Sequence, residues 1–488
     1  MTSNQLVGLI GIDWGIGARE RSVGLYWTEG IPQRDCRAHQ NLRSFGRKSD
    51  RRFVDLQFLE GLGVVVMSRS IRVFLLALVQ ACASSVLASA QAAPSHTDLS
   101  QTDLSNVQRI APPVAFVYVA AAQGSISDIN AYAAAANGTL TPVSGSPFAG
   151  SGTYVAAMAA NRRGLLVTDT VNIYSFSVAW NGALNEVSSI YAQQYNQYPT
   201  GGPVSLFFDR SRATLYDEDI YWDGANNNYQ FFDFAGGAGA LSYLGATSSV
   251  SAAWDTPLSF TGNNLDGYGA TCLRGGQYIY GFSRSNSGTL TPLNISPTIP
   301  TASKGGYCPY LVATDPANDV AISLTPTLDG FTAIGPPQIA VYTADEAGDL
   351  TTNSTSANMP ASAVKSVYDM KMSPAGDLLA ISGTNGLQVF HFNGANPATR
   401  FTGLMTKDEV DQVFWDNANH LYAISRPAGK LYVFTVTPTN VRQAPGSPYS
   451  INAPQNIAVL PRSRFRRPDC QRVGMTAPGG KFFPGACF

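Results

Sequence analysis

The chain contains the stretch Gly138-Thr139-Leu140-Thr141-Pro142-Val143 and repeats it as Gly288-Thr289-Leu290-Thr291-Pro292-Leu293. The first three residues, Gly-x-Leu, recur five times in all, and the successive steps are 44, 57, 49 and 60 residues. Those steps fit a four-stranded blade of about 40–50 residues with loop insertions. Each Gly-x-Leu follows an apolar, aromatic run, so the pattern predicts a strand, a tight glycine turn and a second strand. The five glycines are Gly138, Gly182, Gly239, Gly288 and Gly348.

Laid end to end, the repeats define seven units. No segment shows a capped, apolar stripe of helical period over three turns. Runs such as Ala115–Ala120 and Leu421–Ser425 are apolar on both alternating faces, as expected for strands held between neighbouring blades. The sequence therefore predicts an all-β, seven-bladed β-propeller over residues 114–461, with units starting near residues 114, 154, 203, 258, 309, 364 and 408.

The first unit lacks an opening strand, because it begins directly with Phe116-Val117-Tyr118-Val119. A matching strand stands at the other end of the repeats, as Gln455-Asn456-Ile457-Ala458-Val459-Leu460. We predict that this C-terminal strand completes the first blade and closes the ring. Closure would remove the exposed sheet edges that otherwise invite aggregation.

Charge is sparse and unevenly distributed along the 488 residues. Charged residues make up 13% of the chain and hydrophobic residues 44%. Residues 93–460 carry 15 Lys and Arg against 25 Asp and Glu, whereas the tail from Pro461 carries 6 against 1. An acidic body argues against nucleic acid as a partner, since phosphate binding needs clustered cations. We expect residues 462–488 to be an unstructured basic tail and residues 91–113 a flexible lead-in.

A secretory signal is predicted at residues 67–90. Met67 opens a basic start, Val73–Val79 is an apolar run, and Ala88-Ser89-Ala90 is a small-x-small cleavage site. Residues 1–66 are then an upstream extension that is spurious or unstructured. The alternative makes Val73–Ala90 a signal anchor, although 18 residues containing Gln80 are short and polar for a stable span. We expect an exported protein, periplasmic or extracellular, with no stable membrane span after cleavage.

Four cysteines follow the cleavage site: Cys272, Cys308, Cys470 and Cys487. An even count in an oxidising compartment permits two disulfides with three possible connectivities. The local pairings Cys272–Cys308 and Cys470–Cys487 are favoured, and neither has metal-ligand spacing.

The chain resembles exported bacterial seven-bladed propellers of the lactonase-like superfamily, which includes 6-phosphogluconolactonase-type enzymes. The motifs that carry the resemblance are a Tyr-Val strand, a strand ending in an aromatic, Gly-x-Leu-Thr-Pro-Val and Gly-Ser-Pro-Phe. They stand here at Phe116–Val119, Ile129–Tyr132 and Gly138–Phe148, and the resemblance covers nearly all of residues 114–461. These motifs are structural and imply the fold more than the activity.

The resemblance implies that an active member would place His, Arg and Glu at one mouth of the channel. Only His391 and His420 stand in the propeller, each on an apparent strand, so we interpret both as structural and assign no catalytic residue. The His-Pro-x-Gly motif of the enzyme branch is missing. No phosphate-binding loop, dinucleotide fingerprint, zinc-protease motif or nucleophile elbow is present, so no cofactor is supported.

The most polar segment runs from Asp217 to Gly224. Its carboxylates lie beside Tyr221 and Trp222 and could coordinate Ca²⁺ or contact a sugar, with Asp217, Asp219 and Asp223 as candidate ligands. The spacing does not match an EF-hand loop, and a solvated acidic loop is the favoured interpretation.

Seven repeats without a catalytic constellation favour a binding or scaffold propeller. We expect a monomer that recognises a protein, glycan or small ligand through loops at one end of its channel. The alternative is a lactone or sugar-ester hydrolase, which rests on the family resemblance alone. A structural protein of the cell surface is a third option.

Overall fold

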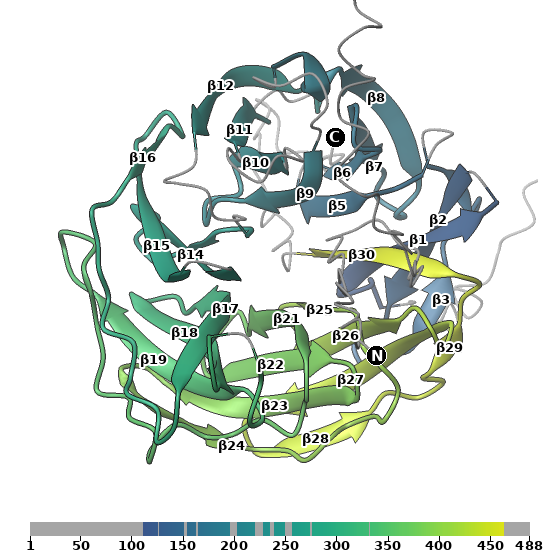
Figure 1. Ribbon diagram of the computed structural model, residues 1–488. Coiled ribbons are helices and arrows are strands. Elements are labelled where there is room, and N and C mark those ends of the chain that lie inside the picture. The colour runs from purple at the N-terminus through teal and green to yellow at the C-terminus, as the bar shows by residue number, and fades with distance from the viewer. Residues whose placement is uncertain are drawn as a thin grey trace, which may run out of the picture. The chain divides into compact units, whose positions relative to one another are not determined.

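The computed structural model describes residues 111–462, apart from residues 125, 151–153, 163, 196–202, 220–227, 235–238, 249–255, 274–275 and 331. In this part of the chain, seven antiparallel β-sheets surround a common centre (Figure 1). The described residues contain one short 3-10 helix, η2 (Ala192–Tyr195), and no helix long and apolar enough to cross a membrane. The predicted extension, signal peptide and basic tail lie outside the described residues, as does all of the lead-in except its last three residues.

The seven sheets follow one another along the chain, and we number them as blades 1 to 7. Blade 1 contains β1 (Ala115–Gln123), β2 (Ile126–Ala134), β3 (Leu140–Pro142), β4 (Phe148–Ala149) and β30 (Pro454–Pro461). Blade 2 contains β5 (Ala157–Asn161), β6 (Gly164–Thr168), β7 (Ile173–Val178) and β8 (Leu184–Ile190). Blade 3 contains β9 (Pro203–Phe208), β10 (Thr214–Asp219), β11 (Asn228–Asp233) and β12 (Ser242–Ser248). Blade 4 contains β13 (Ser259–Phe260), β14 (Asp266–Leu273), β15 (Gly276–Arg284) and β16 (Leu290–Pro292).

The remaining three blades have the same order. Blade 5 contains β17 (Gly306–Thr314), β18 (Asp319–Thr327), β19 (Gln338–Ala344) and β20 (Leu350–Thr351). Blade 6 contains β21 (Val367–Met372), β22 (Leu378–Gly383), β23 (Gly386–Asn393) and β24 (Asn396–Arg400). Blade 7 contains β25 (Gln412–Trp415), β26 (His420–Ser425), β27 (Lys430–Thr437), β28 (Asn440–Gln443) and β29 (Tyr449–Ser450). The seven-bladed prediction is confirmed, and the first strand of each unit begins within four residues of its predicted start.

The C-terminal strand closes the ring as predicted. β30 pairs antiparallel with β1, with Val117 opposite Val459, so the two ends of the repeats share one sheet. Asn456 of this strand reaches blade 2, because its side-chain amide donates to the carbonyls of Val155 at 2.9 Å and Ala156 at 3.0 Å. On the other side, the Gln412 side chain of blade 7 accepts from the Ile457 backbone at 3.0 Å. β30 thus joins blade 7, blade 1 and blade 2.

The core lies between the blades, which explains why inner strands are apolar on both faces. On β1, Val117 and Val119 pack toward Val433 of blade 7. The alternating residues Phe116 and Tyr118 pack toward blade 2. Successive strand side chains point to opposite faces, so a blade buried on both faces needs an unbroken apolar run.

The Gly-x-Leu turns join the third and fourth strands, and their glycines touch the preceding blade. All five have a left-handed φ between 76° and 91°, which glycine adopts at little cost. Tyr118 donates to the Gly182 carbonyl of the next blade at 3.1 Å, Tyr216 to Gly288 at 2.7 Å, and Tyr268 to Gly348 at 2.8 Å. These hydrogen bonds, which we call blade tethers, explain why the repeat contains glycine.

The Gly-Ser-Pro motif also has one structural role in both of its copies. Ser146 accepts from the Ala131 backbone at 2.9 Å, and Ser447 accepts from the Val433 backbone at 2.8 Å. Both Ser-Pro peptide bonds are cis, and each motif leads into a short fifth strand, β4 or β29. The repeated sequence therefore marks equivalent positions in blades 1 and 7.

Candidate functional site

The turns that join the first and second strands of blades 2 to 5 contact one another, and we call this surface the inner-turn rim. From blade 2, the Asn161 side chain donates to the Arg212 carbonyl of blade 3 at 2.7 Å. The Arg210 backbone donates to the Asn264 side chain of blade 4 at 2.7 Å. In turn, the Gly262 backbone of blade 4 donates to the Ala317 carbonyl of blade 5. The blade 3 turn is therefore held from both sides.

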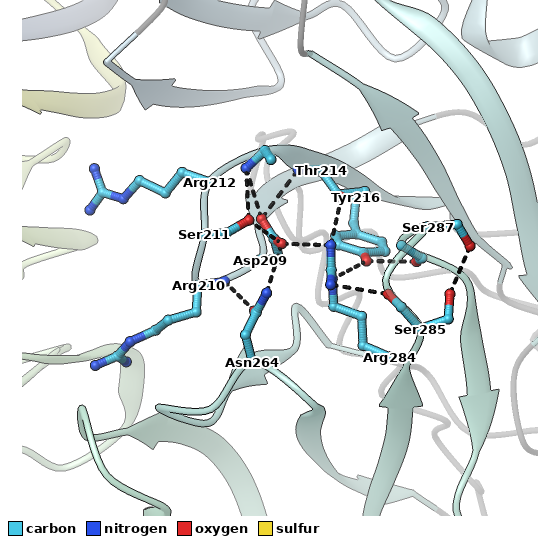
Figure 2. Close-up of polar contacts among 12 residues, drawn as sticks. Asp209, Arg210, Ser211, Arg212, Thr214, Tyr216, Asn264, Arg284, Ser285 and Ser287 are labelled. Carbon is cyan, nitrogen blue, oxygen red and sulfur yellow. Dashed lines mark hydrogen bonds and ion pairs between the residues drawn. The ribbon is translucent and has the colours of Figure 1, made fainter.

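Asp209 organises the turn Asp209-Arg210-Ser211-Arg212 at the end of β9 (Figure 2). One carboxylate oxygen accepts from the backbones of Ala213 at 3.0 Å and Thr214 at 3.2 Å. The other accepts from the Ser211 hydroxyl at 2.7 Å and the Asn264 amide at 3.0 Å. A buried carboxylate with this many donors fixes the loop in one conformation.

A third arginine, Arg284 at the end of β15, forms an ion pair with Asp209 and hydrogen bonds with its neighbours. Its guanidinium lies 2.8 Å from the Asp209 carboxylate, and both side chains are buried. It also donates to the Tyr216 hydroxyl at 3.2 Å and the Thr214 hydroxyl at 2.9 Å. Because buried charges need a partner and satisfied donors, we interpret Arg284 as the structural counter-ion of Asp209.

Arg212 occupies a backbone conformation that disfavours its side chain. Its φ is 57°, in the left-handed region. The equivalent turn position is Asn264 in blade 4, Gly376 in blade 6 and Asn419 in blade 7, all with positive φ. Asn and Gly tolerate this region, whereas other residues lose roughly 1 kcal/mol or more. Arginine at this position therefore has a conformational cost that Asn or Gly avoids.

Arg210 and Arg212 extend away from the Asp209–Arg284 pair (Figure 2). Among the residues that the structure describes, no group accepts a hydrogen bond from either guanidinium, and neither forms an ion pair. Desolvation lowers the pKa of both groups, the charge of Arg210 further lowers the pKa of Arg212, and the charge of Asp315 raises that of Arg210. Arginine stays protonated at neutral pH. The rim therefore has two cations without a hydrogen-bonded or ion-paired partner among the described residues, in a propeller whose net charge is negative.

The acidic segment behaves differently from the sequence prediction. Asp217, Glu218 and Asp219 are the last residues of β10, so the prediction of a loop is wrong for them. Asp217 and Glu218 are buried, where Asp217 accepts from the Gln230 backbone at 3.2 Å and Glu218 from the Ser205 hydroxyl at 2.9 Å. The prediction of a solvated acidic loop is thus also wrong for Asp217 and Glu218, because both are buried.

The metal prediction stays open. Asp223 lies outside the described residues, and within them no group of three or more His, Cys, Asp and Glu side chains is placed to hold a metal ion. Ca²⁺ binding by Asp217, Asp219 and Asp223 remains a prediction.

Both histidines have structural surroundings. His420 is buried in β26, where its Nδ1 lies 2.8 Å from the Asp416 carboxylate, which also accepts from the Tyr422 hydroxyl at 2.9 Å. His391 is half-buried in β23 and its ring lies 4.3 Å from that of Phe401. Both histidines lie on strands, as expected, and their interpretation as structural residues stays a prediction.

Of the two favoured disulfides, the structure forms Cys272–Cys308, with the Cα atoms 5.3 Å apart. This bond links β14 of blade 4 to β17 of blade 5. Cys470 and Cys487 lie outside the described residues, so their pairing stays a prediction.

The sequence prediction missed Arg210 and Arg212. A usable signal was present, because Asp209-Arg210-Ser211-Arg212 places two arginines within one turn of a body that has 15 cations against 25 acidic residues. What the sequence could not show is that Arg284 neutralises Asp209 and leaves the other two unpaired.

Comparisons with known proteins identify the fold. No protein-family model and no curated protein matches the chain. Among solved structures, a candidate 6-phosphogluconolactonase from Bacteroides fragilis has a TM-score of 0.51 and 13% identity, covering 71% of this chain and 97% of its own. A Lactobacillus plantarum protein has a TM-score of 0.50 and 14% identity, covering 71% and 99%. A periplasmic gluconolactonase from Pseudomonas aeruginosa has a TM-score of 0.49 and 12% identity, covering 71% and 98%. The chain thus shares the fold of lactonase-like propellers, and at these identities the likeness is one of fold alone.

Proposed function

We propose that this chain is an exported binding propeller whose inner-turn rim recognises a negatively charged ligand. The observation that carries the proposal is the pair Arg210 and Arg212. Their guanidinium groups form no hydrogen bond or ion pair among the described residues, although the turn beneath them is fixed by three blades. Export is supported by the predicted signal at residues 67–90.

The rim suits recognition because it is ordered before any ligand arrives. Binding costs less when loops and side-chain donors are already positioned. Asn161 and Asn264 anchor the backbone of the arginine turn, and Asp209 fills its interior. A guanidinium presents a planar fork of donors that matches a carboxylate or phosphate in two parallel hydrogen bonds. The two cations therefore favour an anion with oxygen acceptors.

Hydrolysis has less support at this face. The rim carboxylates Asp209 and Asp315 accept hydrogen bonds from their own turns, Asp315 from the Ala317 backbone at 2.8 Å and the Asp319 backbone at 3.0 Å. They hold the turns in shape and are poorly placed to activate water. Fold likeness alone does not carry an activity.

The test is isothermal calorimetry with citrate, a tricarboxylate probe, at low ionic strength. We expect citrate to bind the wild-type protein and the double variant R210A/R212A to lose about 10–100-fold in affinity. That loss is about 1.4–2.8 kcal/mol, the contribution of one hydrogen bond to a charged group. Arg442→Ala is the matched control, because Arg442 is an exposed arginine on β28, an outer strand of blade 7. It should bind as the wild type does.

The same preparations are assayed for hydrolysis of glucono-1,5-lactone. Equal citrate affinity in the wild type and R210A/R212A would overturn the proposal. Lactone turnover that disappears in R210A/R212A would replace binding with hydrolysis at this face.

A further inference from the structure

Trp180 is an unusually exposed aromatic side chain. It lies in the turn between β7 and β8 and is 83% exposed, more than any other large hydrophobic side chain among the described residues. Its indole ring makes no ring contact within that part of the chain. Tryptophan is enriched at binding interfaces, because its ring combines a large apolar face with an N–H donor.

The fold places this tryptophan at the same end of the ring as the arginines. Gly164, the first residue of β6, pairs with Ser177 near the end of β7, so the turn containing Trp180 lies beside the inner turn of blade 2. That inner turn contains the exposed Arg162, and its Asn161 bonds to the Arg212 backbone at 2.7 Å. The same end of blades 2 and 3 thus carries Trp180, Arg162, Arg212 and Arg210, and we call these four residues the Trp–Arg track.

The track combines an indole ring with guanidinium groups, and this combination favours some classes of anion over others. A pyranose ring has an apolar C–H face that stacks on an indole, and a uronate ring adds a carboxylate that pairs with a guanidinium. An acidic glycan repeats both groups along an extended strand. An acidic peptide supplies the charges without a regular stacking face. A single-stranded nucleic acid also stacks on aromatic rings and pairs its phosphates with cations, so an oligonucleotide is the polyanion against which the glycan has to be compared.

We infer that the Trp–Arg track binds an acidic glycan, with a sugar ring on Trp180 and uronate carboxylates on Arg212 and Arg210. The inference rests on the proposed function and specifies its ligand class. Arg162 adds an exposed third cation at this end of blades 2 and 3.

The experiment compares four probes by calorimetry and by tryptophan fluorescence: a galacturonic acid hexamer, maltohexaose, poly-L-glutamate and a twelve-residue oligothymidylate. We expect the galacturonate hexamer to bind most tightly, to quench the fluorescence of Trp180 and to bind more weakly as salt rises. Maltohexaose, which has the sugar rings without the charges, should bind at least tenfold more weakly.

Three variants complete the design. Trp180→Ala and R210A/R212A should each weaken galacturonate binding about tenfold or more, and Trp180→Ala should leave citrate binding unchanged. Leu244→Ala, which truncates an exposed apolar residue on β12, is the control and should have no effect. Unchanged melting temperatures for these surface variants separate binding effects from folding.

The outcomes distinguish the inference from the proposed function. Poly-L-glutamate or oligothymidylate binding as tightly as galacturonate, or full affinity in Trp180→Ala, would overturn the acidic glycan. If citrate binding still depends on Arg210 and Arg212 in that case, the anion-binding function stands and only its ligand class is wrong. If neither galacturonate binding nor citrate binding depends on Arg210 and Arg212, both the acidic-glycan inference and the anion-binding function are wrong.

Discussion

The left-handed backbone of Arg212 lowers the stability of the fold, whereas its side chain serves the proposed anion binding. Its φ of 57° lies in the left-handed region, as does the φ of Asn264, Gly376 and Asn419, residues that adopt this conformation readily. The neighbouring Asn161 holds the Arg212 carbonyl at 2.7 Å and so helps to impose the conformation. Asn or Gly would adopt this conformation at a lower cost than Arg.

Replacing Arg212 with Asn should therefore stabilise the protein. We expect the free energy of unfolding in urea to rise by roughly 0.5–1 kcal/mol, since the strain of a non-glycine left-handed residue is relieved. Citrate affinity should fall in the same variant. A variant that is less stable than the wild type and binds citrate normally would contradict this account of Arg212.

Asp315 gives a prediction for pH. Burial raises the pKa of this carboxyl above its usual 3.8, an effect that two backbone hydrogen bonds and the charge of Arg210 reduce but do not cancel. A group whose pKa is higher in the folded than in the unfolded state loses stability as pH rises through that interval. The charged carboxyl thus costs stability at neutral pH.

Asp315→Asn keeps an oxygen acceptor for the turn and removes that charge. We expect the melting temperature of the variant relative to the wild type to be higher at pH 7 than well below pH 3.8, where the carboxyl holds its proton in both the folded and the unfolded state. Citrate should also bind the variant more tightly at pH 7, because an acidic neighbour of Arg210 is gone. A difference in melting temperature that grows as pH falls would refute the assignment.

Single residues were the least predictable level from sequence. The pairing of Asp209 with Arg284 joins residues on different blades, and no local pattern reveals it. Likewise, Asp217 and Glu218 look like loop residues because they are charged, yet they are buried in β10, where Gln230 and Ser205 donate to them. Long-range partners overrode the local composition in both cases.

At the scale of the elements, the Gly-x-Leu turn is the joint between blades. Tyr118, Tyr216 and Tyr268 each stand on the second strand of a blade and donate to the glycine carbonyl of the next blade. Blade 2 lacks an equivalent tyrosine, and Ser175 donates to Gly239 instead. The repeated glycine is therefore a contact residue as well as a turn residue.

Alanine substitutions at two of these glycines separate the two roles. At Gly182 a Cβ atom would lie 2.5 Å from the Phe116 ring, whereas at Gly239 the nearest atom is 3.4 Å away. Both substitutions strain a left-handed backbone by about 1 kcal/mol, and only Gly182→Ala also overpacks the blade interface, by roughly 1–3 kcal/mol more. Urea unfolding should show the larger loss for Gly182→Ala. Equal losses would mean that the turn, and not the contact, requires glycine.

Elements were predicted well because their signals are local and repeated. Strand, glycine turn and strand follow from residues within one unit, and the recurrence of Gly138-Thr139-Leu140 fixed the unit length. The end of β10 was wrongly predicted as a loop, because its last three residues, Asp217, Glu218 and Asp219, are charged. The turns of the rim are brought together by contacts between different blades, such as that of Arg210 with Asn264. The sequence of a single unit does not reveal such contacts.

For the whole molecule, closure by β30 ties the termini of the repeats together. The strand pairs with β1 and its Asn456 bonds to blade 2. Every blade is then flanked on both faces, which the apolar residues of β1 require. The closure could be predicted because the first unit visibly lacks a strand that the last residues supply.

Truncation after Asn452 removes β30 and exposes the buried face of β1. We expect the single cooperative thermal transition to be lost or lowered by more than about 10 °C, since several buried apolar side chains such as Ile457 and Val459 go with the strand. Deleting only residues 463–488 is the control and should leave the transition unchanged. An unaltered melting curve after removal of β30 would disprove closure.

The central claim is that the inner-turn rim binds an anion through Arg210 and Arg212. The most direct test is the citrate dissociation constant of R210A/R212A measured beside the wild type and Arg442→Ala in one buffer. The account predicts a rise of about 10–100-fold for the double variant and none for the control. Identical constants for all three proteins would contradict it.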